Sequence, residues 1–231
     1  MKAANDPVTN VDVEIEEFLQ AELHDLFPGD TIVGEELAAT SGEESSDDHR
    51  TWFVDPIDGT LNFSRGIPMY CVSIALQAGG ESVVGVIYDP SRDELFSARR
   101  GHGARLDGTS IEVSDVSSLG DSLLVTGFPR SLDAVEEDNL MNFAKLTRAS
   151  RGVRRLGSAA LDLAYVAAGR LDGFWEYYLN PWDTAAGYLL VSEADGRVSD
   201  ASGGRYTAHE QSVLATNGHL HDEIIERLEK I

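Results

Sequence analysis

The sequence predicts a layered α/β or α+β protein, because helix-like and strand-like segments alternate along nearly all of its 231 residues. Some segments have apolar residues at helical spacing, and others are short apolar runs between glycine, proline and polar turns. The hydrophobic fraction of 42% is ordinary for a globular protein. We therefore expect one domain over residues 1–231, with two closely joined lobes that divide near residues 120–130 without a linker.

Five segments are predicted to be helical. The first, 9–26, has four apolar residues on one face and glutamates on the other. The apolar four are Ile15, Phe18, Leu19 and Leu23. Ser158 is expected to cap the third predicted helix, and Gly169 is expected to terminate it. The other predicted helices are 139–147, 183–193 and 221–230.

Seven short segments are predicted to be strands. They are 52–54, 71–77, 82–88, 94–99, 123–126, 174–177 and 213–216, with turns at 78–80 and 89–91. Pro56 is expected to end the first strand, because proline cannot donate to a sheet ladder. The segment 101–103 is expected to be a hairpin turn and not a nucleotide cradle, because no helical pattern follows it.

Asp55 and Asp58 follow the strand 52–54 and directly precede Gly59 and Thr60. Gly59 permits a tight turn and a close approach of a ligand to the backbone. The residues after it can begin a helix, whose unpaired N–H groups attract anions. Carboxylates beside such a backbone repel phosphate unless cations lie between them, and no lysine or arginine is close in sequence. The segment therefore indicates a site for divalent metal and phosphate.

Two other acidic residues have a similar relation to apolar runs. Glu35 follows the run 31–33, and Asp183 lies in the first turn of a predicted helix. Singly, each acidic residue is explained as a turn former, a cap or a solvated side chain; jointly, they lie where sheet edges gather ligands. The Gly-Glu-Glu motif recurs at Glu43, but no apolar run precedes that copy, so Glu35 is the candidate ligand.

These segments resemble the motifs of the inositol monophosphatase family, which are lithium-sensitive and magnesium-dependent phosphatases. The match continues through Gly157-Ser158-Ala159-Ala160 and the segment 172–176, in the expected order and over nearly the whole chain. The resemblance implies stacked α-β-α-β-α layers of the inositol monophosphatase and fructose-1,6-bisphosphatase type, with the site between the lobes.

The resemblance also implies roles for individual residues. Two or three Mg²⁺ ions would be held by Glu35, Asp55, the backbone carbonyl of Ile57, Asp58 and Asp183. Substrate would contact Asp58, Gly59, Thr60, Ala159, Glu176 and Asp183. Asp12, Glu35 and Thr60 would act in catalysis, with Asp12 hydrogen-bonded to Thr60. From the residues alone, Asp12 equally fits a capping box that begins at Thr9, and Glu176 also fits an exposed strand.

The expected reaction is direct hydrolysis of a phosphate monoester by water, with inositol 1-phosphate as the first candidate substrate. Fructose 1,6-bisphosphate, alone or as a second activity, histidinol phosphate and 3'(2'),5'-bisphosphate nucleotides remain alternatives. A regulator that binds metal or phosphate without catalysis is an alternative of another class. A haloacid-dehalogenase-type phosphatase fits less well, because its two aspartates are separated by one residue, whereas Pro56 and Ile57 both intervene here.

The net charge of −22 comes from 40 acidic and 18 basic residues, of which only Lys2, Lys145 and Lys230 are lysines. Such a surface disfavours nucleic acid and anionic membranes. The resemblance implies a small phosphorylated polyol or sugar as the partner. An excess of acid with few lysines is typical of proteins from high-salt cells, so we expect a halophilic source, with an acidic mesophile as the alternative.

Cys71 is the only cysteine, which excludes an internal disulfide, and we expect it to be a small core residue. With no signal peptide and no apolar run long enough to span a bilayer, a cytoplasmic protein is expected. We also expect a homodimer. The family normally has another helix before the segment 8–9, so either this chain is truncated or that helix is dispensable.

Overall fold

The computed structural model describes residues 10–37, 39–40, 50–128 and 139–228. The predictions made for Thr9, Glu43 and Lys230 lie outside the described residues.

The first sheet follows the order of the chain. Its strands are β1 (Thr31–Gly34), β2 (Arg50–Asp58), β3 (Cys71–Ala78), β4 (Glu81–Asp89), β5 (Glu94–Arg99), β6 (Ala104–Leu106) and β7 (Thr109–Ile111). β1 lies parallel to β2, and every later neighbour is antiparallel. The segment 101–103 is the turn between β5 and β6, as expected. The short strands β6 and β7 were not predicted, because three residues carry little periodicity.

β2 continues through Pro56, so the prediction that proline ends this strand is wrong. β1 pairs only with residues 51–54 of β2, and beyond them no N–H is needed on that side. On the other side, the register with β3 shifts between Asp55 and Asp58. A bulge of this kind accommodates a residue that cannot donate. The strand therefore carries both aspartates to its carboxyl end.

The second sheet has the order β11-β12-β10-β8-β9. Its strands are β8 (Leu123–Thr126), β9 (Gly152–Arg154), β10 (Gly173–Tyr177), β11 (Arg197–Ser199) and β12 (Ser212–Thr216). The three inner strands were predicted, whereas the two three-residue edge strands were not. The chain passes from the first sheet to the second through a short 3₁₀ turn, η1 (Leu119–Asp121).

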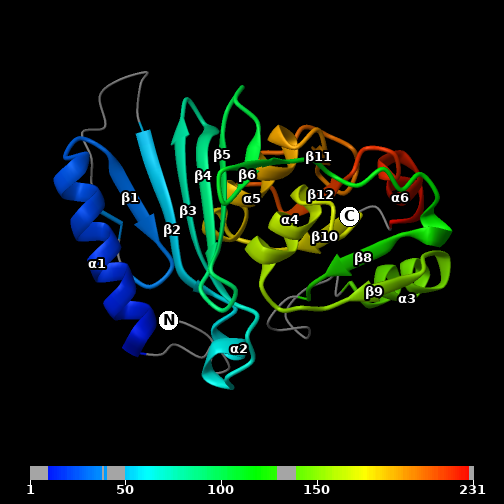
Figure 1. Cartoon of the computed structure of the whole chain (residues 1–231), viewed down its shortest axis with the longest axis horizontal. Helices are drawn as coiled ribbons and strands as arrows, with labels where there is room; N and C mark the ends of the chain where they lie inside the picture. The colour runs from blue at the N-terminus through cyan, green and yellow to red at the C-terminus, as the bar shows by residue number, and fades with distance from the viewer. Residues whose placement is uncertain (1–9, 38, 41–49, 129–138, 229–231) are drawn as a thin grey trace.

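Two helices fill the space between the sheets (Figure 1). α4 (Ala159–Ala167) is buried along its whole length, and α5 (Pro181–Glu193) is buried over residues 183–191. Helices covered on all sides are apolar all round, which explains why both segments lack a strong amphipathic pattern. α5 approaches β4 closely: a Cβ added at Gly85 would lie 2.8 Å from the carbonyl oxygen of Ala186.

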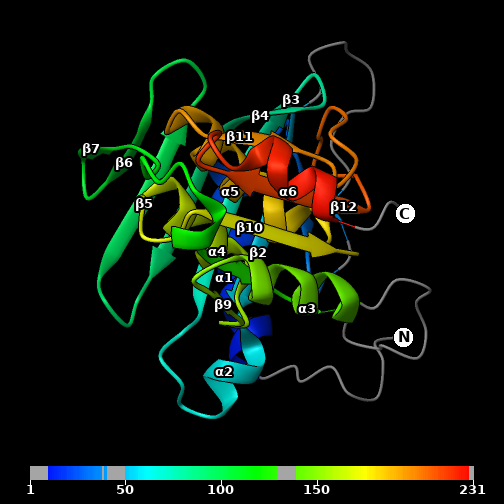
Figure 2. The same cartoon turned by 90° about the vertical axis from the view of Figure 1, so that its right-hand side faces the viewer.

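The outer layers are also helical (Figure 1, Figure 2). α1 (Asn10–Leu26) packs on β1 and β2, while α3 (Leu140–Ala149) and α6 (His221–Arg227) lie on the far side of the second sheet. The order of layers is therefore α-β-α-β-α, which confirms the predicted fold. Among the described residues, no helix combines the length and the apolar composition needed to cross a membrane.

The predicted apolar face of α1 is partly wrong. Phe18 is 61% exposed, whereas Asp12 and Glu16 are fully buried and Leu23 is buried beside them. The helix therefore turns two carboxylates, one turn apart, toward the sheet. Each carboxylate has hydrogen-bonding partners on that side of the helix. A prediction based only on the positions of apolar residues does not detect them.

Candidate metal and phosphate site

Asp55, Asp58 and Asp183 lie together and are all buried. Each offers a carboxylate oxygen, and these oxygens lie within 4.8 Å of one another. The first two come from the end of β2, and the third comes from the first turn of α5, on the face of the first sheet that α5 covers. The fold thus joins two segments that are about half the chain apart in sequence.

The Asp55 carboxyl is strongly perturbed by its surroundings. Burial raises its pKa well above the usual value, and the charge of Glu35, followed by those of Asp58 and Asp183, raises the pKa further. A hydrogen bond with Glu35 acts in the same direction. Glu35 therefore lies beside Asp55, so all four predicted carboxylates meet in one place.

Asp58 is bound to the start of α4. Its Oδ2 accepts hydrogen bonds from the Ser158 hydroxyl and from the backbone N–H of Ala160, both at 2.7 Å. Ser158 occupies the N-cap position as predicted, but its side chain makes no capping bond. The carboxylate of Asp58 satisfies this helix start instead. An anionic acceptor is well suited to that position, because the positive end of the helix dipole is there.

Asp183 both caps α5 and contributes to the cluster. The helix begins at Pro181, two residues earlier than predicted, and the backbone N–H of Asn180 donates to Asp183 Oδ2 at 2.6 Å. The capping interpretation and the metal interpretation of this residue are therefore compatible.

Thr60 connects the β2 loop to α1. Its hydroxyl lies 2.9 Å from the carbonyl oxygen of Ile57 and 3.2 Å from Asp12 Oδ1. The predicted contact between Asp12 and Thr60 is thus present, across 48 positions of sequence. Whether Asp12 also completes a capping box with Thr9 lies outside the described residues.

Gly59 has a backbone conformation that a side chain would strain, with φ of 97°. A Cβ there would lie 2.8 Å from the carbonyl oxygen of Met69. Asn62 holds this arrangement, because its amide donates to the carbonyls of Met69 and Leu156, both at 2.8 Å. Sequence reasoning assigned Asn62 no role in the site. The only available signal was its position in the turn of the short helix α2 (Thr60–Ser64).

Glu176 is buried in β10, so it is not an exposed strand residue. Its carboxylate packs against Gly127, where any Cβ would overlap it. Burial raises the pKa of Asp162 well above the usual value, and the charges of Glu176 and Asp58 raise the pKa further. Asp162, which sequence reasoning missed, therefore connects Glu176 electrostatically to the aspartate cluster. Ala159, another of the predicted substrate contacts, is buried in the first turn of α4.

The donor set fits a hard divalent cation. All the candidate ligands are oxygens, which favour Mg²⁺ over softer metals. Mutual repulsion among buried carboxylates, seen in the raised pKa of Asp55, is relieved by a cation between them. Cys71 is buried near Asp58, and burial raises its pKa well above the usual value, so the thiol stays neutral and is no ligand for such an ion.

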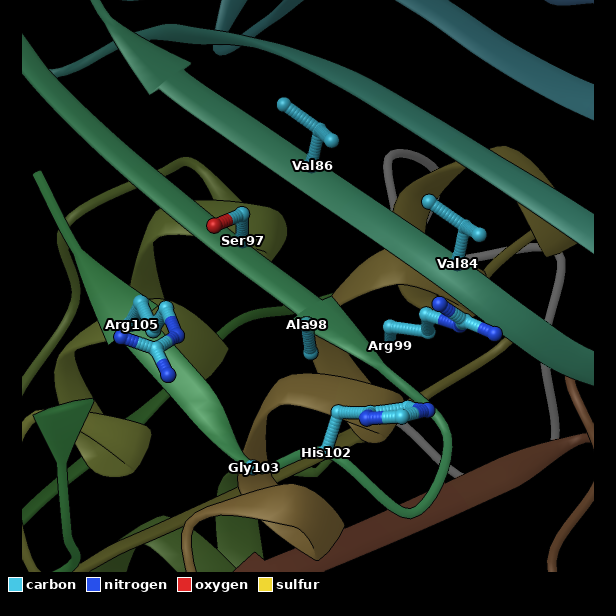
Figure 3. Close-up of a pocket in the computed structure, with 8 residues that line it drawn as sticks. All are labelled: Val84, Val86, Ser97, Ala98, Arg99, His102, Gly103 and Arg105. Carbon is cyan, nitrogen blue, oxygen red and sulfur yellow. The ribbon is translucent and has the colours of Figure 1, made fainter. Parts of the chain in front are cut away.

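An open hollow of about 260 Å³ lies elsewhere, on the first sheet (Figure 3). Val84 and Val86 form part of its lining, and Arg99, His102 and Arg105 add basic groups. Gly85 faces α5, so its neighbours Val84 and Val86 point to the opposite face of the sheet. None of the predicted site residues lines this hollow.

Five alternating layers around a cluster of buried carboxylates place the chain in the class of layered α+β proteins. The sequence matches the inositol monophosphatase family over residues 1–231. It is 44% identical over 230 residues to the inositol-1-monophosphatase of Mesorhizobium japonicum, covering 100% of this chain and 85% of that protein.

Two further relatives agree. The Nus factor SuhB of Escherichia coli is 42% identical over 238 residues, with 99% of this chain and 88% of that protein covered. The structure of an inositol monophosphatase from Anabaena superposes with a TM-score of 0.90 at 42% identity, covering 95% of this chain and 86% of the other. The chain belongs to the inositol monophosphatase family, a family of phosphatases.

Proposed function

We propose that this protein is a Mg²⁺-dependent phosphate monoester hydrolase whose preferred substrate is a phosphorylated polyol such as inositol 1-phosphate. The observation that carries the proposal is the crowding of Asp55, Asp58 and Asp183, with ligand oxygens within 4.8 Å of one another. Family membership supports phosphatase chemistry at this site.

Each residue of the site would have a defined task. Glu35, Asp55, Asp58 and Asp183 would hold the ions through their side chains, and Ile57 through its carbonyl. Bound there, Mg²⁺ supplies a Lewis acid that lowers the pKa of water and offsets phosphate charge.

The remaining groups act on water and substrate. Thr60, held by Asp12 and the Ile57 carbonyl, would accept a hydrogen bond from the attacking water and so orient it. The backbone N–H groups of Gly59 and Thr60 would bind the phosphate oxygens.

The surroundings of Glu176 support a polyol as the leaving group. A buried carboxylate can accept hydrogen bonds from sugar or polyol hydroxyls. Glu176 lies close enough to Asp162 for its charge to raise the pKa of that residue, and the Glu176 carboxylate would disfavour a second phosphate by repulsion. This favours a monophosphate over fructose 1,6-bisphosphate or a bisphosphate nucleotide.

A substrate panel tests the proposal. Phosphate release should be measured with inositol 1-phosphate, fructose 1,6-bisphosphate, histidinol phosphate and a 3',5'-bisphosphate nucleotide, at low and molar KCl, with Mg²⁺ or with EDTA. We expect the largest kcat/KM for inositol 1-phosphate and no turnover in EDTA. The same panel with Asp55→Asn controls for contaminating phosphatases. A larger kcat/KM for either bisphosphate would overturn the substrate assignment.

The name of the E. coli relative favours a second candidate function. That protein, 42% identical, is called a Nus factor, a name that states no hydrolytic activity. A regulator that keeps the fold and the metal site would gain thermal stability from Mg²⁺ yet hydrolyse no ester of the panel. That combination of results would replace the first proposal with this one.

A further inference from the structure

Glu16 of α1 is fully buried and binds the loop that follows β1. Its Oε2 accepts a hydrogen bond from the backbone N–H of Glu36 at 2.8 Å, and its Oε1 accepts one from Leu37 at 2.9 Å. The amide of Gln20 donates to Oε1 at 3.1 Å. One carboxylate thus holds two consecutive N–H groups of a loop 20 residues away.

Gly34 lets this carboxylate come so close. A Cβ at Gly34 would overlap the carboxylate of Glu16, and only a glycine leaves that space open. Gly34 is the last residue of β1, so Glu16 contacts the backbone on both sides of Glu35. These contacts fix the position of the backbone from which the Glu35 side chain reaches Asp55.

Glu35 is the candidate ligand that depends on this support. The other three carboxylates belong to the end of β2 or the first turn of α5, whereas Glu35 lies in a bend after a four-residue strand. Its side chain nevertheless reaches Asp55. Beyond the strand, Glu16 binds the backbone N–H groups of the two residues that follow Glu35.

We propose that Glu16 is a positioning residue that sets the affinity of the site for a divalent cation by holding the Glu35 loop. The inference rests on the proposed metal site, and it adds a residue that touches neither metal nor substrate. Partners that orient metal ligands typically change metal affinity by about 10–100-fold when they are removed.

Glu16→Gln tests this with the smallest change in shape. The amide keeps one oxygen acceptor but turns an NH₂ group toward the second backbone N–H, so one hydrogen bond is lost and two donors face each other. Glu17→Gln, an exposed neighbour on the same helix, removes the same charge without that contact. Binding of Mn²⁺ to the substrate-free protein should be measured by calorimetry, together with the Mg²⁺ concentration for half-maximal activity.

We expect Glu16→Gln to weaken Mn²⁺ binding about 10-fold or more, and to raise the Mg²⁺ requirement with little loss of kcat at saturating Mg²⁺. Glu17→Gln should match the wild type in both. A role limited to stability would lower the melting temperature of the metal-free protein and leave Mn²⁺ affinity unchanged. That result would overturn the proposal.

Gly34→Ala provides an independent test, because its Cβ displaces the carboxylate without altering Glu16 itself. Gly29→Ala is the control, since a Cβ there meets nothing within 4 Å. If both changes act through the same contact, their effects should not add. The double variant Glu16→Gln/Gly34→Ala should then have about the same Mn²⁺ affinity as whichever single variant binds Mn²⁺ less tightly. Fully additive losses would contradict a shared mechanism.

Asp55→Asn separates failure of this inference from failure of the proposed function. If Asp55→Asn leaves Mn²⁺ binding intact, the metal site itself is wrong. If Asp55→Asn abolishes binding while Glu16→Gln behaves like Glu17→Gln, only the positioning role is wrong.

Discussion

The effect of Asp55 on the stability of the fold depends on whether a cation lies among the surrounding carboxylates. Its Oδ1 accepts a hydrogen bond from the Ile57 N–H at 3.0 Å, which favours the charged form. Burial and the charge of Glu35 outweigh that bond, so the pKa is raised. Without metal, the ionised residue therefore opposes folding, and in the proposed site a bound cation would offset this cost.

The metal-free protein should lose stability as pH rises, and Asp55→Asn should reduce that loss. A carboxyl with a raised folded pKa contributes its full stability below its unfolded pKa of about 3.9, and the contribution disappears as pH rises through the folded pKa. Asparagine keeps the oxygen that bonds Ile57 but has no charge. Melting temperatures in EDTA from pH 4.5 to 8 should fall less steeply for the variant than for the wild type.

At pH 8, Mg²⁺ should reverse which of the two proteins, wild type or Asp55→Asn, has the higher melting temperature. A ligand that binds only the folded site raises the melting temperature by mass action. The wild type should gain from Mg²⁺ at pH 8, and Asp55→Asn should gain little. An equal gain in both proteins would contradict the assignment of Asp55 as a ligand.

α5 is the element that brings Asp183 to the site, and both of its ends are held. At its start, the Asn180 N–H donates to Asp183. At its end, Glu193 accepts backbone N–H bonds from Gly101, His102 and Gly103 at 2.8, 3.1 and 2.8 Å. The turn after β5 thus binds the carboxylate of Glu193, at the end of α5.

The close packing of α5 on β4 predicts a large effect for one added methyl group. In Gly85→Ala the new Cβ would lie 2.8 Å from the carbonyl oxygen and 3.0 Å from the Cα of Ala186, and backbone cannot rotate away. Overpacking of this kind costs about 1–3 kcal/mol, and the displaced helix should also bind metal less tightly. Urea unfolding and Mn²⁺ calorimetry measure the two effects.

Gly29→Ala serves as the control for Gly85→Ala, because the added methyl meets no neighbour. Its free energy of unfolding should stay within about 1 kcal/mol of the wild type, with any change on the stabilising side. If Gly85→Ala were as mild as Gly29→Ala, α5 would be free to shift on the sheet.

The whole molecule carries a net charge of −22, and self-repulsion opposes its compact state in dilute buffer. The ion pairs with the best geometry use arginine, as where Arg170 holds both oxygens of Glu94 at 2.6 and 2.7 Å. Such pairs offset a small part of the charge. The halophilic source, the homodimer and the division into lobes near residues 120–130 stay predictions.

Salt should stabilise the protein over two ranges of concentration. Screening acts over about 10 Å at 0.1 M and about 3 Å at 1 M, so pure screening is largely complete early. A protein adapted to high salt should continue to gain melting temperature into molar KCl. Measurements with and without Mg²⁺ separate this from weaker metal attraction. A plateau by a few tenths molar would contradict the halophilic source and leave the phosphatase proposal unaffected.

The sequence alone determined the features that depend on short spacings. Asp55, Asp58 and Gly59 mark their own turn within five residues, and the alternation of segments indicated the layered fold. The motif order indicated the family. Site roles inferred from that resemblance, including those of Ala159 and Glu176, stay predictions.

The tertiary structure decided the features that depend on contacts between distant segments. From the sequence, Glu16 is expected to face solvent and the Ser158 side chain to cap a helix. In the structure the loop at Glu36 covers Glu16, and the Ser158 hydroxyl donates to Asp58, 100 positions away in sequence. Pro56 ends a strand unless a bulge accommodates it. In each case the energy of a polar group depends on which partner folding brings to it, and local sequence does not specify that partner.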